Sequence, residues 1–151
     1  MTAARPTRDH FAVIRSCPTR WADNDVYGHV NNAAYYGLFD TAVNAWLIER
    51  GLLYTAASSA IGLVIETGCR YHAALSFPET IEVAMRVEKL GNSSVRYALA
   101  LFSEGQDQAA ADGWFIHVYV DRETRRPTPM PADIRAALEG LIIGNGGRDR
   151  D

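Results

Sequence analysis

Residues 20–51 have the sequence RWADNDVYGHVNNAAYYGLFDTAVNAWLIERG, in which a polar turn leads into a helix. Up to Asn32 the stretch is rich in Asp, Asn and Gly, which favour turns. From Tyr35 to Trp46 the apolar residues recur three and four positions apart, the spacing of one helix face. Either Asn31 or Asn32 can cap the N-terminus, and Gly51 stands where a left-handed C-terminal residue is expected. This pattern predicts one central helix of about five turns.

Strand-like segments lie on both sides of this helix. One precedes it at residues 11–17, and four follow at residues 63–71, 80–90, 94–102 and 114–120. Residues 80–90 alternate apolar and polar side chains with a period of two, which indicates a sheet with one buried face. Residues 108–112 fit a strand or a loop, and we favour a strand. Residues 132–141 predict a short final helix after Pro131. The predicted fold class is α+β, a strand and a helix followed by a meander of four strands in one curved antiparallel sheet.

Composition limits the organisation and the partners of the chain. Its 151 residues are 48% hydrophobic and 22% charged, as expected of one globular domain. We place that domain at residues 9–141 and expect flexible tails at 1–8 and 144–151. The 15 basic and 18 acidic residues give a net charge of −3, without the basic excess of a nucleic-acid-binding domain. No apolar run is long enough to cross a membrane and no leader-like stretch is present, so we expect a cytoplasmic protein.

Two further expectations concern cysteine and self-association. Cys17 and Cys69 are too few for a disulfide framework and lack a metal-ligand spacing. A single long helix covers only one face of the predicted sheet, and the chain carries 3 Trp, 7 Tyr and 5 Phe. Small domains with so much apolar surface often pair. We therefore expect a homo-oligomer formed through a sheet edge or a helix face; a monomer with its aromatic residues buried is the alternative.

The turn before the helix contains the residues best suited to chemistry. A helix N-terminus offers free N–H groups and the positive end of the helix dipole, which can hold a developing negative charge. A carboxylate beside it supplies a nucleophile or base, so the turn holds two components of acyl transfer. The alternative is structural, because Asp and Asn before a helix are often caps and turn formers.

Residues 20–36 resemble the signature of the hot-dog-fold acyl-CoA thioesterases, in the branch that includes 4-hydroxybenzoyl-CoA thioesterase. Weaker matches follow in the same order at residues 69–75, 77–79, 89–94 and 120–127. The resemblance therefore covers about residues 12–138. It implies an antiparallel sheet wrapped around a central helix, paired into a homodimer or a homotetramer, with active sites between subunits. It also implies an acyl-CoA substrate and no metal or other cofactor.

The resemblance assigns roles within the turn. Asp25 matches the catalytic carboxylate, which either attacks the thioester carbonyl or acts as a base on water. The backbone N–H of Asn32 matches the oxyanion donor. Asp23 is the rival carboxylate, at a position that more often supports the turn. Tyr27, Gly28 and His29 would contribute to substrate binding: Tyr27 lines the acyl pocket or packs the turn, and His29 shapes the site or acts as a base.

Other candidate residues lie outside the turn. Glu66 stands in an otherwise apolar run, where it positions water or substrate for the neighbouring subunit or marks a solvated strand edge. The turn that would bind the phosphates of coenzyme A aligns with residues 91–93, and the candidate binding residues in and around it are Lys89, Ser93, Ser94 and Arg96. Because only Lys89 and Arg96 are basic there, an acyl-carrier-protein substrate stays open. Two other functions are a non-catalytic acyl-CoA-binding module, which retention of Asp25 disfavours, and hydration of an enoyl thioester, whose local motif is absent from the sequence.

Overall fold

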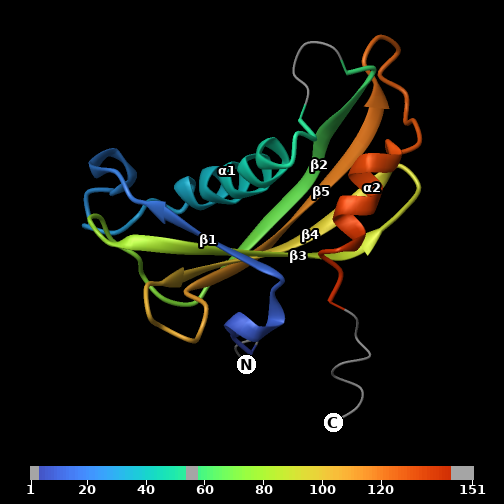
Figure 1. Ribbon diagram of the computed structural model, residues 1–151. Coiled ribbons are helices and arrows are strands. Elements are labelled where there is room, and N and C mark those ends of the chain that lie inside the picture. The colour runs from blue at the N-terminus through green and yellow to red at the C-terminus, as the bar shows by residue number, and fades with distance from the viewer. Residues whose placement is uncertain (1–3, 54–57, 144–151) are drawn as a thin grey trace.

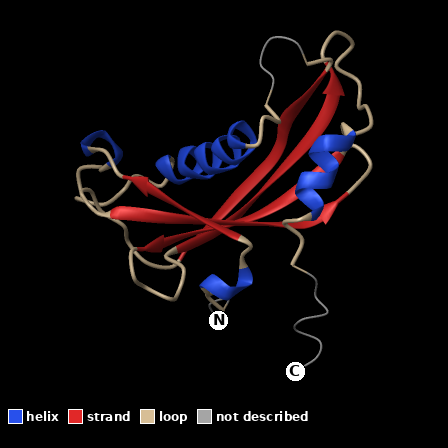
Figure 2. Cartoon of the chain, viewed as in Figure 1, coloured by secondary structure: helices blue, strands red, loops and turns tan. Residues whose placement is uncertain are grey.

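The computed structural model describes residues 4–53 and 58–143. In chain order its regular elements are η1 (Arg8–His10), β1 (Val13–Pro18), η2 (Trp21–Asp23), α1 (Ala34–Glu49), β2 (Ala60–Tyr71), β3 (Thr80–Leu90), β4 (Ser94–Ser103), β5 (Ala111–Asp121) and α2 (Ala132–Glu139). Within the described residues five strands form one curved sheet, and α1 lies across its concave side (Figure 1). Figure 2 shows the same arrangement by secondary structure, so the predicted α+β architecture is confirmed.

The strand order is β1-β3-β4-β5-β2, and every neighbouring pair is antiparallel. The predicted meander is right for β3, β4 and β5 but wrong for β2, which pairs with β5 and forms the far edge of the sheet. The connections give the physical reason. Residues 91–93 are a tight turn that keeps β3 and β4 adjacent, whereas residues 72–79 are long enough to carry the chain to the opposite edge.

The helix α1 packs one face against the sheet because its apolar residues recur at helical spacing. The residues that it buries are Tyr35, Phe39, Ala42, Val43, Trp46 and Leu47. The predicted cap is corrected: Ala33 occupies the N-cap position and makes no side-chain cap bond. Asn31 lies two residues before this N-cap, and its Oδ1 accepts a hydrogen bond from the Ala33 N–H at 2.9 Å. Gly51 has the expected left-handed conformation, with φ of 66°.

Two strands begin earlier than predicted, because their first residues are small and show no apolar–polar alternation. β2 begins at Ala60 rather than at residue 63, and β5 begins at Ala111 rather than at residue 114. The predicted strand at 108–112 is right only for its last two residues, since Gln108 makes an isolated bridge to Thr7. Ala109, Ala110 and Ala111 are all buried, but alanines show no apolar–polar alternation.

Residues 5–8, which belong to the segment expected to be a flexible tail, include two arginines that contact other parts of the chain. Arg5 Nε donates a hydrogen bond to the Ala109 carbonyl at 2.8 Å, and Arg8 forms an ion pair with Glu82 at 2.7 Å. These arginines connect the segment to the loop before β5 and to β3. The other predicted tail, 144–151, lies outside the described residues.

Two glycines allow β2, β5 and α1 to approach closely. A Cβ atom at Gly113 would lie 2.2 Å from the Gly68 carbonyl oxygen and 2.8 Å from the ring of Phe39 on α1. A Cβ atom at Gly68 would lie 2.2 Å from the Trp114 ring, on the sheet face opposite α1. The position of α1 on the sheet therefore depends on the absence of a side chain at Gly113.

Candidate active site

The turn before α1 is built from η2 and a short antiparallel bridge between Asn24 and Val30. The Asp25 N–H donates to the His29 carbonyl at 2.8 Å, and the Gly28 N–H donates to the Asp25 carbonyl at 3.1 Å. Gly28 has φ of 81°, a conformation that glycine adopts without strain. The result is a narrow loop that presents Asp25 at its base and residues 26–27 at its tip.

Asp25 has one carboxylate oxygen available for chemistry. Its Oδ1 accepts a hydrogen bond from the Tyr27 N–H at 2.8 Å, which fixes the side chain in the loop. Its Oδ2 has no hydrogen-bond partner among the residues that the structure describes. The side chain is half-buried and lines a surface hollow with Trp21, Asn24 and Val26. Such a carboxylate can accept a proton or attack an electrophile placed in the hollow.

Both carboxylate oxygens of Asp23, the alternative catalytic residue, accept hydrogen bonds from Arg20. It is 5% exposed, and its Oδ2 accepts the Arg20 N–H at 2.8 Å. Its Oδ1 accepts two bonds from the Arg20 guanidinium, at 2.8 and 3.1 Å. The hydrogen bonds from Arg20 hold the pKa of Asp23 below its ordinary value. Its carbonyl also accepts the Asn31 N–H at 2.7 Å, so Asp23 ties η2 to the approach of α1.

Asn32 lies at the N-terminal approach to α1, and its side chain is exposed. Its backbone N–H has no acceptor within the described part of the chain. Its carbonyl accepts a hydrogen bond from the Tyr71 hydroxyl at 2.8 Å. The Tyr71 ring in turn packs edge-on against Tyr35, with centroids 4.8 Å apart. The end of β2 therefore holds the turn that presents the free N–H.

Exposed apolar side chains surround Asp25. Trp21 is 77%, Val26 93% and Tyr27 82% exposed. His29 is also exposed. The Gly28 carbonyl accepts a hydrogen bond from the Ser76 hydroxyl at 3.0 Å, which connects the loop to the segment before β3. Large apolar side chains exposed together are typical of a surface that another molecule covers.

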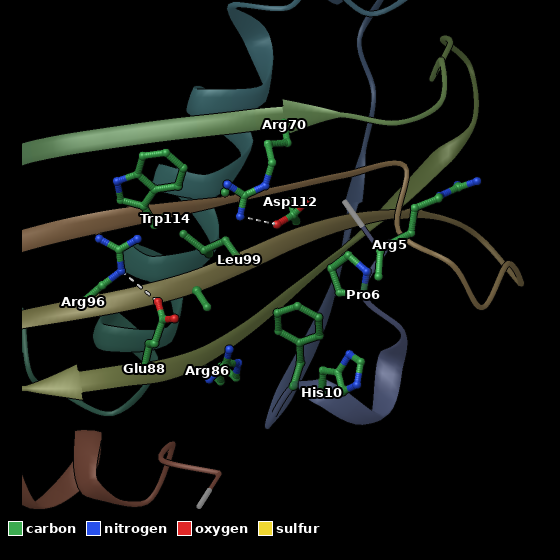
Figure 3. Close-up of a pocket in the computed structure, with 14 residues that line it drawn as sticks. Arg5, Pro6, His10, Arg70, Arg86, Glu88, Arg96, Leu99, Asp112 and Trp114 are labelled. Carbon is green, nitrogen blue, oxygen red and sulfur yellow. Dashed lines mark hydrogen bonds and ion pairs between the residues drawn. The ribbon is translucent and has the colours of Figure 1, made fainter. Parts of the chain in front are cut away.

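Glu66 and Arg96 lie on the sheet face opposite α1, away from this loop. Trp114 Nε1 donates to Glu66 at 2.7 Å, and Arg96 Nε donates to Glu88 at 2.8 Å. Figure 3 shows Arg96 and Arg70 on either side of Trp114, over which their guanidinium groups lie 5.1 and 5.6 Å from the ring. The Arg96 guanidinium also approaches Glu66 to 3.6 Å. These charges already have opposite partners within the chain.

Lys89, Ser93 and Ser94 lie around the turn between β3 and β4. The Ser93 carbonyl accepts the Tyr119 N–H at 2.7 Å, and Arg135 of α2 donates to the carbonyls of Gly91 and Asn92. Residues at the other end of β3 contact the Asp25 loop, so the 11-residue length of β3, about 35 Å, separates the two groups. A single chain does not bring them together.

A buried histidine under α1 was not among the residues predicted from the sequence. His117 of β5 is 5% exposed, and its Nε2 has no hydrogen-bond partner. Burial lowers the pKa of His117, so the imidazole is neutral near pH 7. Its ring borders a cavity of about 270 Å³ between the C-terminal half of α1 and the sheet. The only sequence signal was its position between the inward-facing Phe115 and Tyr119.

Other classes of site lack support in the described residues. No group of three or more His, Cys, Asp or Glu side chains there could hold a metal ion. Burial raises the pKa of Cys69 to about 11 and also raises that of Cys17, so neither is a thiolate near neutral pH. No helix in the described ranges is long and apolar enough to cross a membrane.

Comparisons with known proteins identify the family. A model of the Thioesterase-like superfamily matches residues 19–138. Long-chain acyl-CoA thioesterase FadM of Escherichia coli (strain K12) is 22% identical over 119 residues, covering 78% of this chain and 90% of FadM.

Two solved structures from Pseudomonas aeruginosa are similar over most of both chains. The PA5185 protein of strain PAO1 is 52% identical with a TM-score of 0.88, covering 91% of this chain and 96% of its own. The PA2801 protein is 30% identical with a TM-score of 0.76, covering 83% of this chain and 96% of its own. Because the family model spans most of the chain, this protein belongs to the Thioesterase-like superfamily and is a thioester hydrolase with the hot-dog fold.

Proposed function

We propose that this protein hydrolyses an acyl-CoA thioester to a carboxylic acid and coenzyme A, with Asp25 as the catalytic carboxylate. The contrast between the two aspartates carries the proposal. Asp23 uses both carboxylate oxygens in the fold, whereas Asp25 keeps one oxygen free beside a surface hollow. FadM, a related protein, is a long-chain acyl-CoA thioesterase, which supports this substrate class.

The chemistry requires little beyond this carboxylate and one N–H donor. Asp25 either removes a proton from the attacking water or attacks the thioester carbon itself, forming an anhydride that water then opens. In both routes the carbonyl oxygen gains negative charge, and the free N–H of Asn32 together with the helix dipole would stabilise it. With Asp25 as the base, collapse of the tetrahedral intermediate breaks the C–S bond, and the coenzyme A thiolate takes up the proton that Asp25 removed from water. With Asp25 as the nucleophile, the C–S bond breaks as the anhydride forms, the thiolate takes a proton from solvent, and hydrolysis of the anhydride by water restores the Asp25 carboxylate.

We also propose that two chains pair through their β2 edges. Antiparallel pairing about a two-fold axis near the middle of β2 would place residues 60–62 of one protomer beside residues 69–71 of the other. The Asp25 loop of one protomer and the β3–β4 turn of the other would then lie at the same end of the joined sheet. Lys89, Ser93 and Ser94 would bind the coenzyme A phosphates across the interface; at Arg96 an anion would have to displace Glu88.

In this dimer the remaining candidate residues would serve substrate binding. Tyr27 would be covered by the partner and line the acyl site, while Gly28 and His29 would shape the loop. Glu66, on β2, would lie at the interface, where it would orient Trp114 through their hydrogen bond.

The decisive experiment measures thiol release from aryl, short, medium and long acyl-CoAs with a thiol-reactive dye. Asp25→Asn is compared with Asp23→Asn, a matched change of the neighbouring carboxylate. We expect Asp25→Asn to lower kcat by about a thousandfold or more with the fold intact, because an amide is neither base nor nucleophile. Asp23→Asn should act mainly on stability.

Each other result has a distinct meaning. If Asp23→Asn abolishes turnover and Asp25→Asn does not, the carboxylate assignment is wrong. Tight binding of acyl-CoA without release would indicate a binding module. Failure to bind any acyl-CoA would direct the next assays to acyl-carrier proteins.

A further inference from the structure

The connection between β2 and β3 lies against the Asp25 loop, residues 24–30. The Val30 N–H donates a hydrogen bond to the Leu75 carbonyl at 2.7 Å, and the Phe77 N–H donates to Asn24 Oδ1 at 3.0 Å. Leu75 is completely buried, so this part of the connection is anchored in the core. Both ends of the loop are therefore tied to a fixed part of the chain.

The Gly28 carbonyl is a further point at which the loop is held. It accepts one hydrogen bond from the Ser76 hydroxyl at 3.0 Å and another from Asn24 Nδ2 at 3.4 Å. Glycine has wide conformational freedom, so hydrogen bonds to its carbonyl decide which conformation it adopts here. The Gly28 N–H donates to the Asp25 carbonyl, and the preceding N–H, of Tyr27, donates to Asp25 Oδ1. The orientation of Gly28 therefore affects the backbone that fixes the Asp25 side chain.

Glu79, the residue immediately before β3, fixes the position of Ser76. Its Oε2 accepts a hydrogen bond from the Ser76 N–H at 2.9 Å, and its Oε1 accepts one from the Ser103 hydroxyl of β4 at 2.8 Å. Its backbone carbonyl also accepts the Thr19 hydroxyl at 2.6 Å. The half-buried carboxylate thus connects a central strand of the sheet to the serine that holds the loop.

We propose that Glu79 is a positioning residue for catalysis, which acts through Ser76 and the Gly28 carbonyl on the Asp25 loop. This inference rests on the proposed role of Asp25 in thioester hydrolysis. Both carboxylate oxygens of Glu79 accept hydrogen bonds within the chain, so it holds the loop rather than taking a proton. A displacement of about 1 Å in a catalytic group can lower the rate by up to about a hundredfold, so the position of the loop affects kcat.

This role requires hydrogen bonds and not the negative charge of Glu79. In Glu79→Gln the side-chain oxygen can still accept the Ser76 N–H. The new amide can donate to the Ser103 hydroxyl, because a hydroxyl accepts as well as donates. Glu79→Ala loses both bonds. The conservative variant should therefore retain the function that the alanine variant loses.

The test measures kcat and KM by thiol release, well below the melting temperature of each variant, on the acyl-CoA that the wild type hydrolyses fastest. We expect Glu79→Ala and Ser76→Ala each to lower kcat about tenfold with KM nearly unchanged, and Glu79→Gln to stay within about twofold of the wild type. The double alanine variant should be no slower than the slower single variant by more than about twofold, because both residues act through one contact. Glu82→Ala is the control: it removes another carboxylate of β3, which pairs with Arg8, and should leave kcat unchanged.

Four results would overturn the positioning role. They are an unchanged kcat in Glu79→Ala, a loss in Glu79→Gln as large as in Glu79→Ala, multiplied losses in the double variant, and an equal loss in Glu82→Ala. Ser76→Ala removes only a hydroxyl and decides the question if Glu79→Ala does not fold. An unchanged kcat in Ser76→Ala would show that the hydroxyl does not hold the loop.

A second measurement separates this inference from the activity on which it rests. If the wild type hydrolyses no acyl-CoA, the proposed function fails, and amide hydrogen exchange of Tyr27 and Gly28, followed by NMR, tests the contact itself. We expect exchange to be about two- to tenfold faster in Glu79→Ala and Ser76→Ala and unchanged in Glu79→Gln. Equal exchange in the wild type and Glu79→Ala would show that Glu79 does not hold the loop.

Discussion

Replacing Gly113 by Ala should destabilise the protein more than any other single methyl addition at the β2–β5 pair. The new Cβ would lie 2.2 Å from the Gly68 carbonyl and 2.8 Å from the Phe39 ring, so both β2 and α1 must shift by about 1 Å. Overpacking of this kind costs about 1–3 kcal/mol, and weakening two flanking ladder hydrogen bonds adds about 1–3 kcal/mol. We expect a loss of about 2–6 kcal/mol, a large part of a typical stability of about 5–15 kcal/mol.

Gly68→Ala is the matched control. Its Cβ would lie 2.2 Å from the Trp114 ring, a side chain on an accessible face that can move aside. The cost is the hydrogen bond to Glu66 and two cation–π contacts, about 2 kcal/mol in all. Urea unfolding followed by circular dichroism measures the loss of stability in both variants. Equal losses, or a greater loss for Gly68→Ala, would refute the distinction between a backbone and a side-chain obstruction.

Two further predictions concern the turn before α1. Tyr71→Phe removes the hydroxyl that holds the Asn32 carbonyl, and we expect kcat to fall about two- to tenfold with KM unchanged, because oxyanion stabilisation acts only in the transition state; a rise in KM alone would argue against a positioning role. Asp23→Asn should lower the melting temperature more at pH 7 than at pH 3. Because the pKa of folded Asp23 is lowered, its stabilising effect is complete well above the ordinary value of 3.8, declines below it, and is lost as pH falls through the lower folded-state value. An unchanged difference between pH 7 and pH 3 would contradict the ion pair with Arg20.

The sequence predicted the elements whose patterns are local. α1 and the strands β3 and β4 were placed correctly because their apolar residues repeat over many positions. The partner of β2 was not predictable in this way, since strand order depends on where the connection 72–79 travels. The beginnings of β2 and β5 were also missed, because Gly62, Ala111 and Gly113 carry no alternation signal.

The same limit applies to the candidate site. The Asp25 loop was found because its turn residues and the helix start lie in one stretch of sequence. The distance between this loop and Lys89 and Ser93 could not be predicted from the sequence. It depends on the fold, in which the loop lies near the beginning of β3 and Lys89 and Ser93 lie near its end. His117 has no local motif at all; its burial under α1 results from elements far apart in the chain.

The two edges of the sheet differ in a way that bears on polymerisation. β1 has only 6 residues and ends at Pro18, which has no N–H to offer an incoming strand. β2 has 12 residues, with exposed Val64 and Ile65 beside its bulge. Pairing through β2 would cover the long exposed edge strand of each chain. Only the two short β1 strands would then remain as unpaired edges of the joined sheet. Assembly by strand addition would thus end at two copies, and a substitution that kept β2 from its partner would turn a self-terminating contact into a template for aggregation.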